Sequence, residues 1–159
     1  MNYKFTLPLS TLLLASGAVA QSNPTLLMSK ASVNESGFCK RQGCEYLSTM
    51  SRDGVKLYDY GLARGTMSVR RRAATSQIFL AKVTTFTPTG NAQFSSTEKR
   101  ILNDFLKSFI GTGWTASMEK ACLQGSKNWN KVGRTPDGVK YSLSCDTRTA
   151  LADITIKAI

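Results

Sequence analysis

The clearest pattern of hydrophobic and polar positions lies between Ser95 and Gly111. Ser95 and Glu98 are spaced as a capping box, and Gly111 is suited to end a helix. Between them, large apolar residues recur at spacings of three and four, which places them on one side of an α-helix. We therefore expect one principal amphipathic helix over 95–111, whose apolar face needs a sheet or another helix to cover it. The apolar residues are Ile101, Leu102, Phe105, Leu106, Phe109 and Ile110.

The flanking segments carry strand patterns, either alternating apolar and polar residues or rich in β-branched and aromatic ones. They predict two hairpins and one further strand, and hence an α+β fold with a mostly antiparallel sheet of five to seven strands packed on the helix. Residues 38–46 are predicted as a tight loop, and 114–123 as either a second helix or a strand. The predicted strands are 55–61, 65–73, 75–86, 139–146 and 150–158.

Four cysteines, an even number, indicate two disulfides if the chain is exported. Three connectivities are possible, and the simplest is Cys39–Cys44 with Cys122–Cys145, because each bridge then closes a local loop. The spacings C-x4-C and C-x22-C, in a chain without histidine, do not fit a zinc site. We predict no metal and no cofactor, since the chain also lacks a phosphate-binding loop, an EF-hand loop and a dinucleotide fingerprint.

The N-terminus has the features of a secretory signal peptide over 1–20. Lys4 supplies the positive charge, a short apolar run follows, and Ala18-Val19-Ala20 is a cleavage sequence. The run is too short to span a bilayer. We therefore expect an exported protein, periplasmic or extracellular, with no transmembrane segment.

Residues 21–159 are long enough for a single small domain with its own core. A weak internal similarity suggests two halves, about 21–90 and 91–159. Asp53-Gly54-Val55-Lys56 recurs as Asp137-Gly138-Val139-Lys140. Independent use of the same favourable turn explains the recurrence as well as duplication does.

The charge balance points to an anionic partner. The chain has 21 Lys and Arg against 10 Asp and Glu, a net charge of +11. A macromolecular polyanion or an acidic protein surface would suit that excess, while general solubility would explain it equally well. The absence of histidine excludes Ser-His-Asp and Cys-His catalytic sites, which leaves paired carboxylates as the main route to hydrolysis.

Three consecutive arginines, Arg70 to Arg72, are the sharpest candidate for a binding site. In a strand, Arg70 and Arg72 share one face. If Tyr58 lies opposite Arg70 on the neighbouring strand, arginines and tyrosines form one surface suited to phosphate contacts and stacking. Two cations of the cysteine loop could extend it. The candidate ligand-binding residues are Lys56, Tyr58, Tyr60, Arg70 and Arg72, with Lys40 and Arg41.

The alternative explanation of these arginines is an edge strand that uses charge to prevent pairing with other chains. The leading functional hypothesis is an exported, non-enzymatic binding module for a polyanion, nucleic acid or cell-envelope polymer. The second is a secreted inhibitor or interaction protein that binds another protein through loops such as 38–46. The third is a small hydrolase without histidine.

Overall fold

The computed structural model describes residues 24–87, 93–124, 129–148 and 150–159. The predicted signal peptide, 1–20, lies outside the described residues. Within them the chain forms, in order, α1 (Gly37–Gln42), β1 (Glu45–Arg52), β2 (Val55–Leu62), β3 (Gly65–Arg72), β4 (Ile78–Phe86), α2 (Ser96–Ile110), α3 (Ala116–Gln124), β5 (Trp129–Arg134), β6 (Lys140–Thr147) and β7 (Leu151–Ala158).

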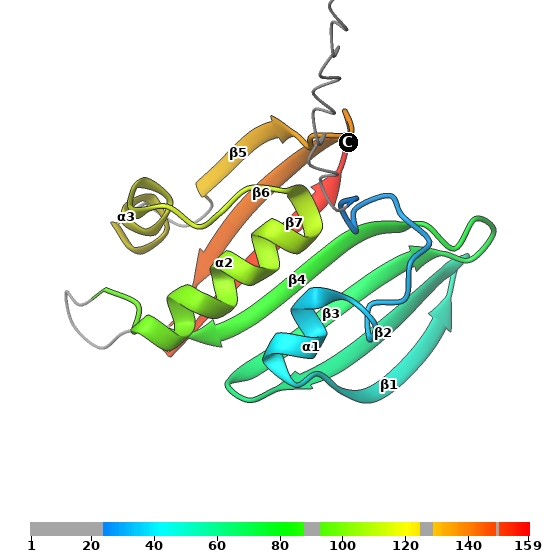
Figure 1. Cartoon of the computed structure of the whole chain (residues 1–159), viewed down its shortest axis with the longest axis horizontal. Coiled ribbons are helices and arrows are strands. Elements are labelled where there is room, and N and C mark those ends of the chain that lie inside the picture. Colours follow the sequence, from blue (N-terminus) through cyan, green and yellow to red (C-terminus); the bar gives the residue numbers. More distant parts are fainter. Residues whose placement is uncertain (1–23, 88–92, 125–128, 149) are drawn as a thin grey trace, which may run out of the picture.

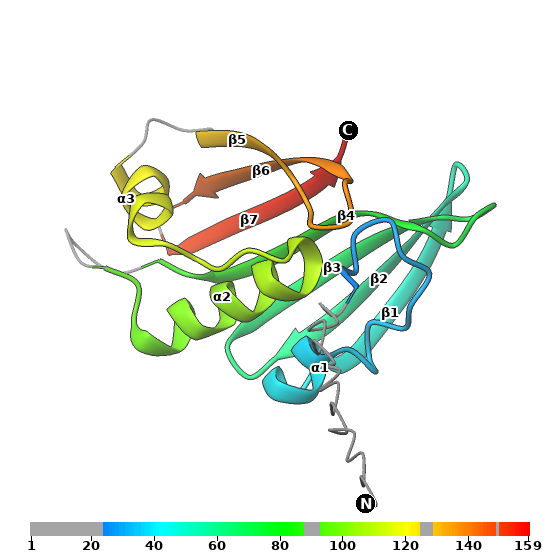
Figure 2. The ribbon, with the colours of Figure 1, turned by 45° about the horizontal axis from the view of Figure 1, so that its top comes forward.

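The strands form one seven-stranded sheet in the order β1-β2-β3-β4-β7-β6-β5, with every neighbouring pair antiparallel. The predicted α+β class and sheet type are confirmed. All three helices lie on one side of the sheet (Figures 1 and 2). We call the opposite side the open face, because no described helix covers it.

Helix α2 confirms the predicted principal helix. The amide of Glu98 donates to Ser95 Oγ at 3.3 Å, as a capping box requires, and Gly111 ends the helix at φ 73°. Its six predicted apolar residues are each no more than 1% exposed. The N-terminal segment completes the helix end, since the amides of Leu26 and Leu27 donate to the carbonyls of Ser108 and Phe109.

Three elements differ from the sequence prediction. Residues 37–42 form a short helix, capped by Ser36 and ended by Gly43 at φ 61°, where a loop was expected. Strands β1 and β5 were not predicted. They are the two outer strands, largely exposed on both faces, so their sequences lack the apolar alternation that reveals a half-buried strand. The ambiguous segment 114–123 is helical from Ala116 onward, in α3, which ends at Gln124.

Both predicted disulfides are confirmed, with Cα–Cα distances of 4.7 Å for Cys39–Cys44 and 5.5 Å for Cys122–Cys145. The first joins α1 to the residue before β1, and the second joins α3 to β6. Two disulfides fit an oxidising, exported environment. None of the described helices is long and apolar enough to cross a membrane.

The two copies of the Asp-Gly-Val-Lys sequence occupy different turns. Asp53 and Gly54 both have positive φ and form the two-residue turn between β1 and β2. At the β5–β6 turn only Gly138 has positive φ, and the Asp137 carboxylate accepts a hydrogen bond from Thr25 at 2.8 Å. Burial would raise the pKa of Asp137, but the hydrogen bonds from Thr135, from Thr25 and from its own backbone lower it below 3.8. The same residues therefore serve two different turn conformations.

Candidate functional site

The predicted pairing of β2 with β3 is wrong by one residue. Tyr58 lies opposite Val69, and Leu57 lies opposite Arg70. The two-residue turn between Leu62 and Gly65 fixes this register. Because a one-residue shift moves every side chain of a strand to the other face, the predicted surface does not form. Lys56, Tyr58 and Tyr60 face the helices, while Arg70 and Arg72 lie on the open face.

Arg71, the middle arginine, is a structural residue. It is only 9% exposed and points to the helix side of the sheet. Its guanidinium donates to the carbonyl of Ser76 at 2.8 Å and to the carbonyl of Ala31, and it lies 5.8 Å from the centroid of the Tyr58 ring. It therefore ties β3 to the turn before β4 and to the N-terminal segment.

The two predicted stacking tyrosines are not available as a platform beside Arg70 and Arg72. Tyr60 is 5% exposed, and its ring meets Tyr46 edge-on at 6.2 Å. Burial raises the pKa of the Tyr60 hydroxyl, although the nearby Arg71 partly offsets that effect. Tyr58 is half-buried beneath Arg71. Lys56 is exposed on this same side, opposite Arg71.

The open face brings Arg70 together with a cation that sequence reasoning missed. Leu80 of β4 lies directly between Arg70 and Lys157 of β7, so the two cations are two strands apart, about 10 Å. Arg72 lies two residues after Arg70 on the same face of β3, and its guanidinium is 5.8 Å from the centroid of the Phe79 ring. We call Arg70, Arg72 and Lys157 the basic band.

Aliphatic side chains surround this band. A single cross-strand row runs through all seven strands and holds two cations, four apolar residues and one serine. Its outer members are highly exposed, at 62% for Met50 and 60% for Val132. The row is Met50, Leu57, Arg70, Leu80, Lys157, Ser142 and Val132.

No carboxylate neutralises the basic band. All ten Asp and Glu lie within the described residues. Four lie on the open face. Asp59 accepts hydrogen bonds from Ser48 and Ser68, and Asp146 and Asp153 are paired with cations that include Arg148. Glu45 lies opposite Gly61, four residues of β2 away from the partner of Arg70. None of the ion pairs formed by these ten groups involves Arg70, Arg72 or Lys157. The band therefore keeps an uncompensated positive potential.

The topology removes the edge-protection explanation of the arginines. Strand β3 is third in the sheet and pairs with β2 on one side and β4 on the other. Its backbone N–H and C=O groups are already paired on both sides, so its arginines are not needed to prevent pairing with other chains.

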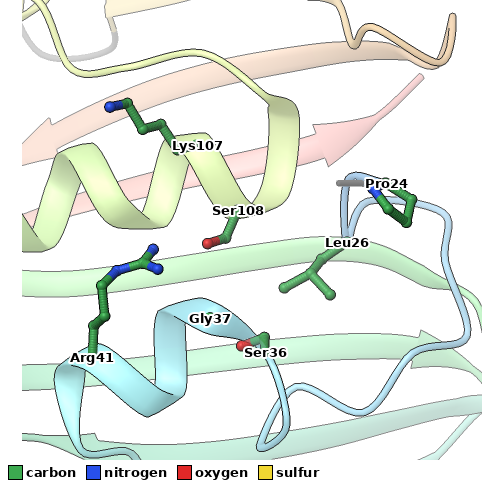
Figure 3. Close-up of a pocket in the computed structure, with 7 residues that line it drawn as sticks. All are labelled: Pro24, Leu26, Ser36, Gly37, Arg41, Lys107 and Ser108. Atoms are coloured by element: carbon green, nitrogen blue, oxygen red, sulfur yellow. The ribbon is translucent and has the colours of Figure 1, made fainter. Parts of the chain in front are cut away.

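Lys40 and Arg41 lie on α1, on the helix side, and do not extend the band. Arg41 Nε lies 3.1 Å from Asp104 Oδ2, which also accepts from Gln42 Nε2 at 2.7 Å. A cavity of about 370 Å³ opens between α1 and α2 (Figure 3). Arg41 points into it toward Ser108, whereas the side chain of Lys107 extends away along α2. One cation already bound to a carboxylate makes a weak anion site.

Neither this cavity nor a second one between α2 and α3, of about 560 Å³, contains two acids that could act as a catalytic pair. The second holds one acid, Glu119, which is bound by Lys99 at 3.2 Å and by the amide of Phe94 at 2.9 Å. Asp146 and Asp153 do lie opposite each other, but on the open face and bridged by Arg148. Among the described residues no cluster could hold a metal ion.

Lys157 could have been placed from sequence by one signal. Ile154 and Ile156 alternate with it along β7, so a buried face for the isoleucines puts Lys157 on the other side. The sequence does not show which strand lies beside β7, since β4 and β7 are far apart in the chain.

Comparison of the chain with protein-family models, curated proteins and solved structures finds no match.

Proposed function

We propose that this protein is an exported, non-enzymatic module that binds an anionic macromolecule through the basic band. The observation that supports this most is the placement of Arg70, Arg72 and Lys157. They lie on interior strands, on the open face, which none of the described helices covers, and none has a carboxylate partner. A polyanion would supply the missing negative charge, in the periplasm or outside the cell.

The basic band recognises its partner by charge and not by stacking on nucleic-acid bases. Stacking needs a free aromatic face beside the cations. The ring of Phe79 lies beneath the Arg72 guanidinium, and Tyr58 and Tyr60 are on the other side of the sheet. We therefore assign a phosphate- or sulfate-bearing polymer of the cell-envelope type ahead of single-stranded nucleic acid.

Binding to heparin, a soluble sulfated polymer, tests the proposal. Fluorescence anisotropy of a labelled heparin fragment should show binding at low salt, and the affinity should fall steeply as salt rises, because each contact releases condensed counterions. Single-stranded DNA of equal charge should bind no more tightly than heparin. Absence of binding to either polymer at low salt would rule out the proposal.

A second candidate function is binding to an acidic protein surface. The specific observation in its favour is the apolar content of the same row, where Met50 and Val132 are more than half exposed and Leu57 and Leu80 flank Arg70. Exposed apolar side chains beside cations are common in protein interfaces. The apolar contacts of such an interface persist at high salt, so its affinity would fall less steeply with salt than that of polymer binding.

A further inference from the structure

The two outer strands of the sheet differ in how much charge they carry to prevent pairing with other chains. Strand β1 (Glu45–Arg52) has seven of its eight residues exposed, and its charged residues stand only at its two ends. Strand β5 (Trp129–Arg134) is shorter and carries Lys131 and Arg134. Charge on an edge strand prevents pairing with other chains, and an uncharged edge presents unpaired N–H and C=O groups. Between its two ends, β1 therefore lacks the charge that β5 carries at Lys131.

We propose that two copies of this chain associate by antiparallel pairing of β1 with β1. The sequence of the strand complements itself in one register. Glu45 then lies opposite the partner's Arg52 at each end, so that two opposite-charge pairs form. Leu47 lies opposite the partner's Met50, and these side chains are 53% and 62% exposed in the single chain. Cross-strand pairs of both kinds stabilise a sheet.

The β-bulge in β1 makes this register consistent with the faces of the sheet. In a regular strand Leu47 and Met50, three residues apart, would point to opposite faces. The register of β1 on β2 shifts between Tyr46 and Ser48. As a result Met50 lies opposite Leu57 on the open face, while the methyl groups of Leu47 approach the same face of Gly61, at 3.6 and 3.8 Å from the position a Cβ would take there. The two apolar side chains therefore meet on one face.

The pairing has a two-fold axis perpendicular to the sheet, as a closed dimer of identical surfaces requires. Both open faces then lie on the same side of one continuous sheet, and so do the two copies of the basic band. A long polyanion could engage both at once, which raises the avidity without any new contact. The dimer itself does not depend on the proposed polymer binding.

The interface is small, since it consists of one eight-residue edge from each copy. Interfaces below about 1,200 Å² are typical of weak, transient association. We therefore expect a dissociation constant on the order of 10–100 µM, measurable by sedimentation velocity.

Charge exchange at the strand ends is the sharpest test. Sedimentation velocity from about 5 to 500 µM should show a monomer–dimer equilibrium for the wild type. Glu45→Arg places like charges opposite each other twice and should weaken the dimer by about five- to thirtyfold. Arg52→Glu should do the same, and the double variant should restore the wild-type constant. Circular dichroism checks that each variant is folded.

Lys131→Glu is the matched control, because it makes the same kind of charge change on the other edge strand and should leave the dimer unchanged. Arg70→Gln with Arg72→Gln should also leave it unchanged, whatever that variant does to heparin binding. A monomer at about 500 µM would overturn the proposal. So would a dimer that ignores both single charge changes, or one that Lys131→Glu weakens equally.

Discussion

At the scale of single residues, three adjacent arginines have two different roles because alternate side chains of a strand point to opposite faces. Arg71 is buried and satisfies two backbone carbonyls, whereas Arg70 and Arg72 are exposed on the open face. The sequence alone shows that Arg71 shares a face with Met67 and Val69. It does not show which residues of β2 share the face of Arg70 and Arg72, since that depends on the register of β2 with β3.

Arg71→Ala should destabilise the protein by about 1–3 kcal/mol, because the carbonyls of Ala31 and Ser76 lose their donor in a part-buried site. Arg70→Ala and Arg72→Ala should each cost less than about 0.5 kcal/mol. Urea unfolding of the three variants measures this. Equal losses at all three positions would contradict the assignment of faces.

Alkaline pH should lower stability through Tyr60. Burial raises the pKa of its hydroxyl above the ordinary value of 10.0, so the folded state holds this proton more tightly than the unfolded state. The contribution of the protonated Tyr60 to stability is fully present below pH 10. It is lost as the pH rises through the raised pKa of Tyr60 in the folded state. Melting temperatures between about pH 8 and 11 should fall less steeply for Tyr60→Phe. An equally steep fall for Tyr60→Phe and the wild type would contradict this contribution.

At the scale of elements, α2 and both disulfides were predictable because their signals are local. The capping box, the apolar periodicity and the final glycine all lie within residues 95–111, and each bridge closes a short loop. Register and strand order were not predictable in the same way. The hairpin register depends on which two residues form the turn, and the contact of β4 with β7 joins distant segments.

Phe105→Ala should destabilise the protein by about 3–5 kcal/mol, because Phe105 is fully buried and packs on Phe38 and Phe109 with ring centroids 6.0 and 4.8 Å away. Lys107→Ala, on the exposed side of α2, should cost less than about 0.5 kcal/mol. Chemical denaturation compares the two. Similar losses would mean that α2 is not packed as described.

Loss of the Cys122–Cys145 bridge should cost about 2–5 kcal/mol, since it closes the longer of the two loops and holds α3 on β6. Thermal unfolding of the Cys122→Ser, Cys145→Ser double variant measures the loss. The Cys39→Ser, Cys44→Ser variant opens a much shorter loop and should lose less. The reverse order would show that α1 depends on its bridge more than α3 does.

At the scale of the whole molecule, one helical layer covers one side of the sheet. The open face carries cations and aliphatic residues, and none of the described helices covers it. The positive net charge of the chain suggested an anionic partner from sequence alone. The location of the charge follows only from the assembled sheet, which joins Arg70 and Arg72 of β3 with Lys157 of β7 and separates them from Lys40 and Arg41.

The salt dependence of heparin binding by matched charge variants tests this account most directly. Arg70→Gln with Arg72→Gln should flatten the log–log slope by roughly 1–1.5, if each lost contact counts for about 0.7, the value for single-stranded nucleic acids. Arg100→Gln with Lys107→Gln removes the same charge from α2 and should leave slope and affinity nearly unchanged. If the basic band is the binding site, only the first pair of substitutions should change the slope. Equal weakening by both pairs would show diffuse attraction to net charge and would contradict the band as a binding site.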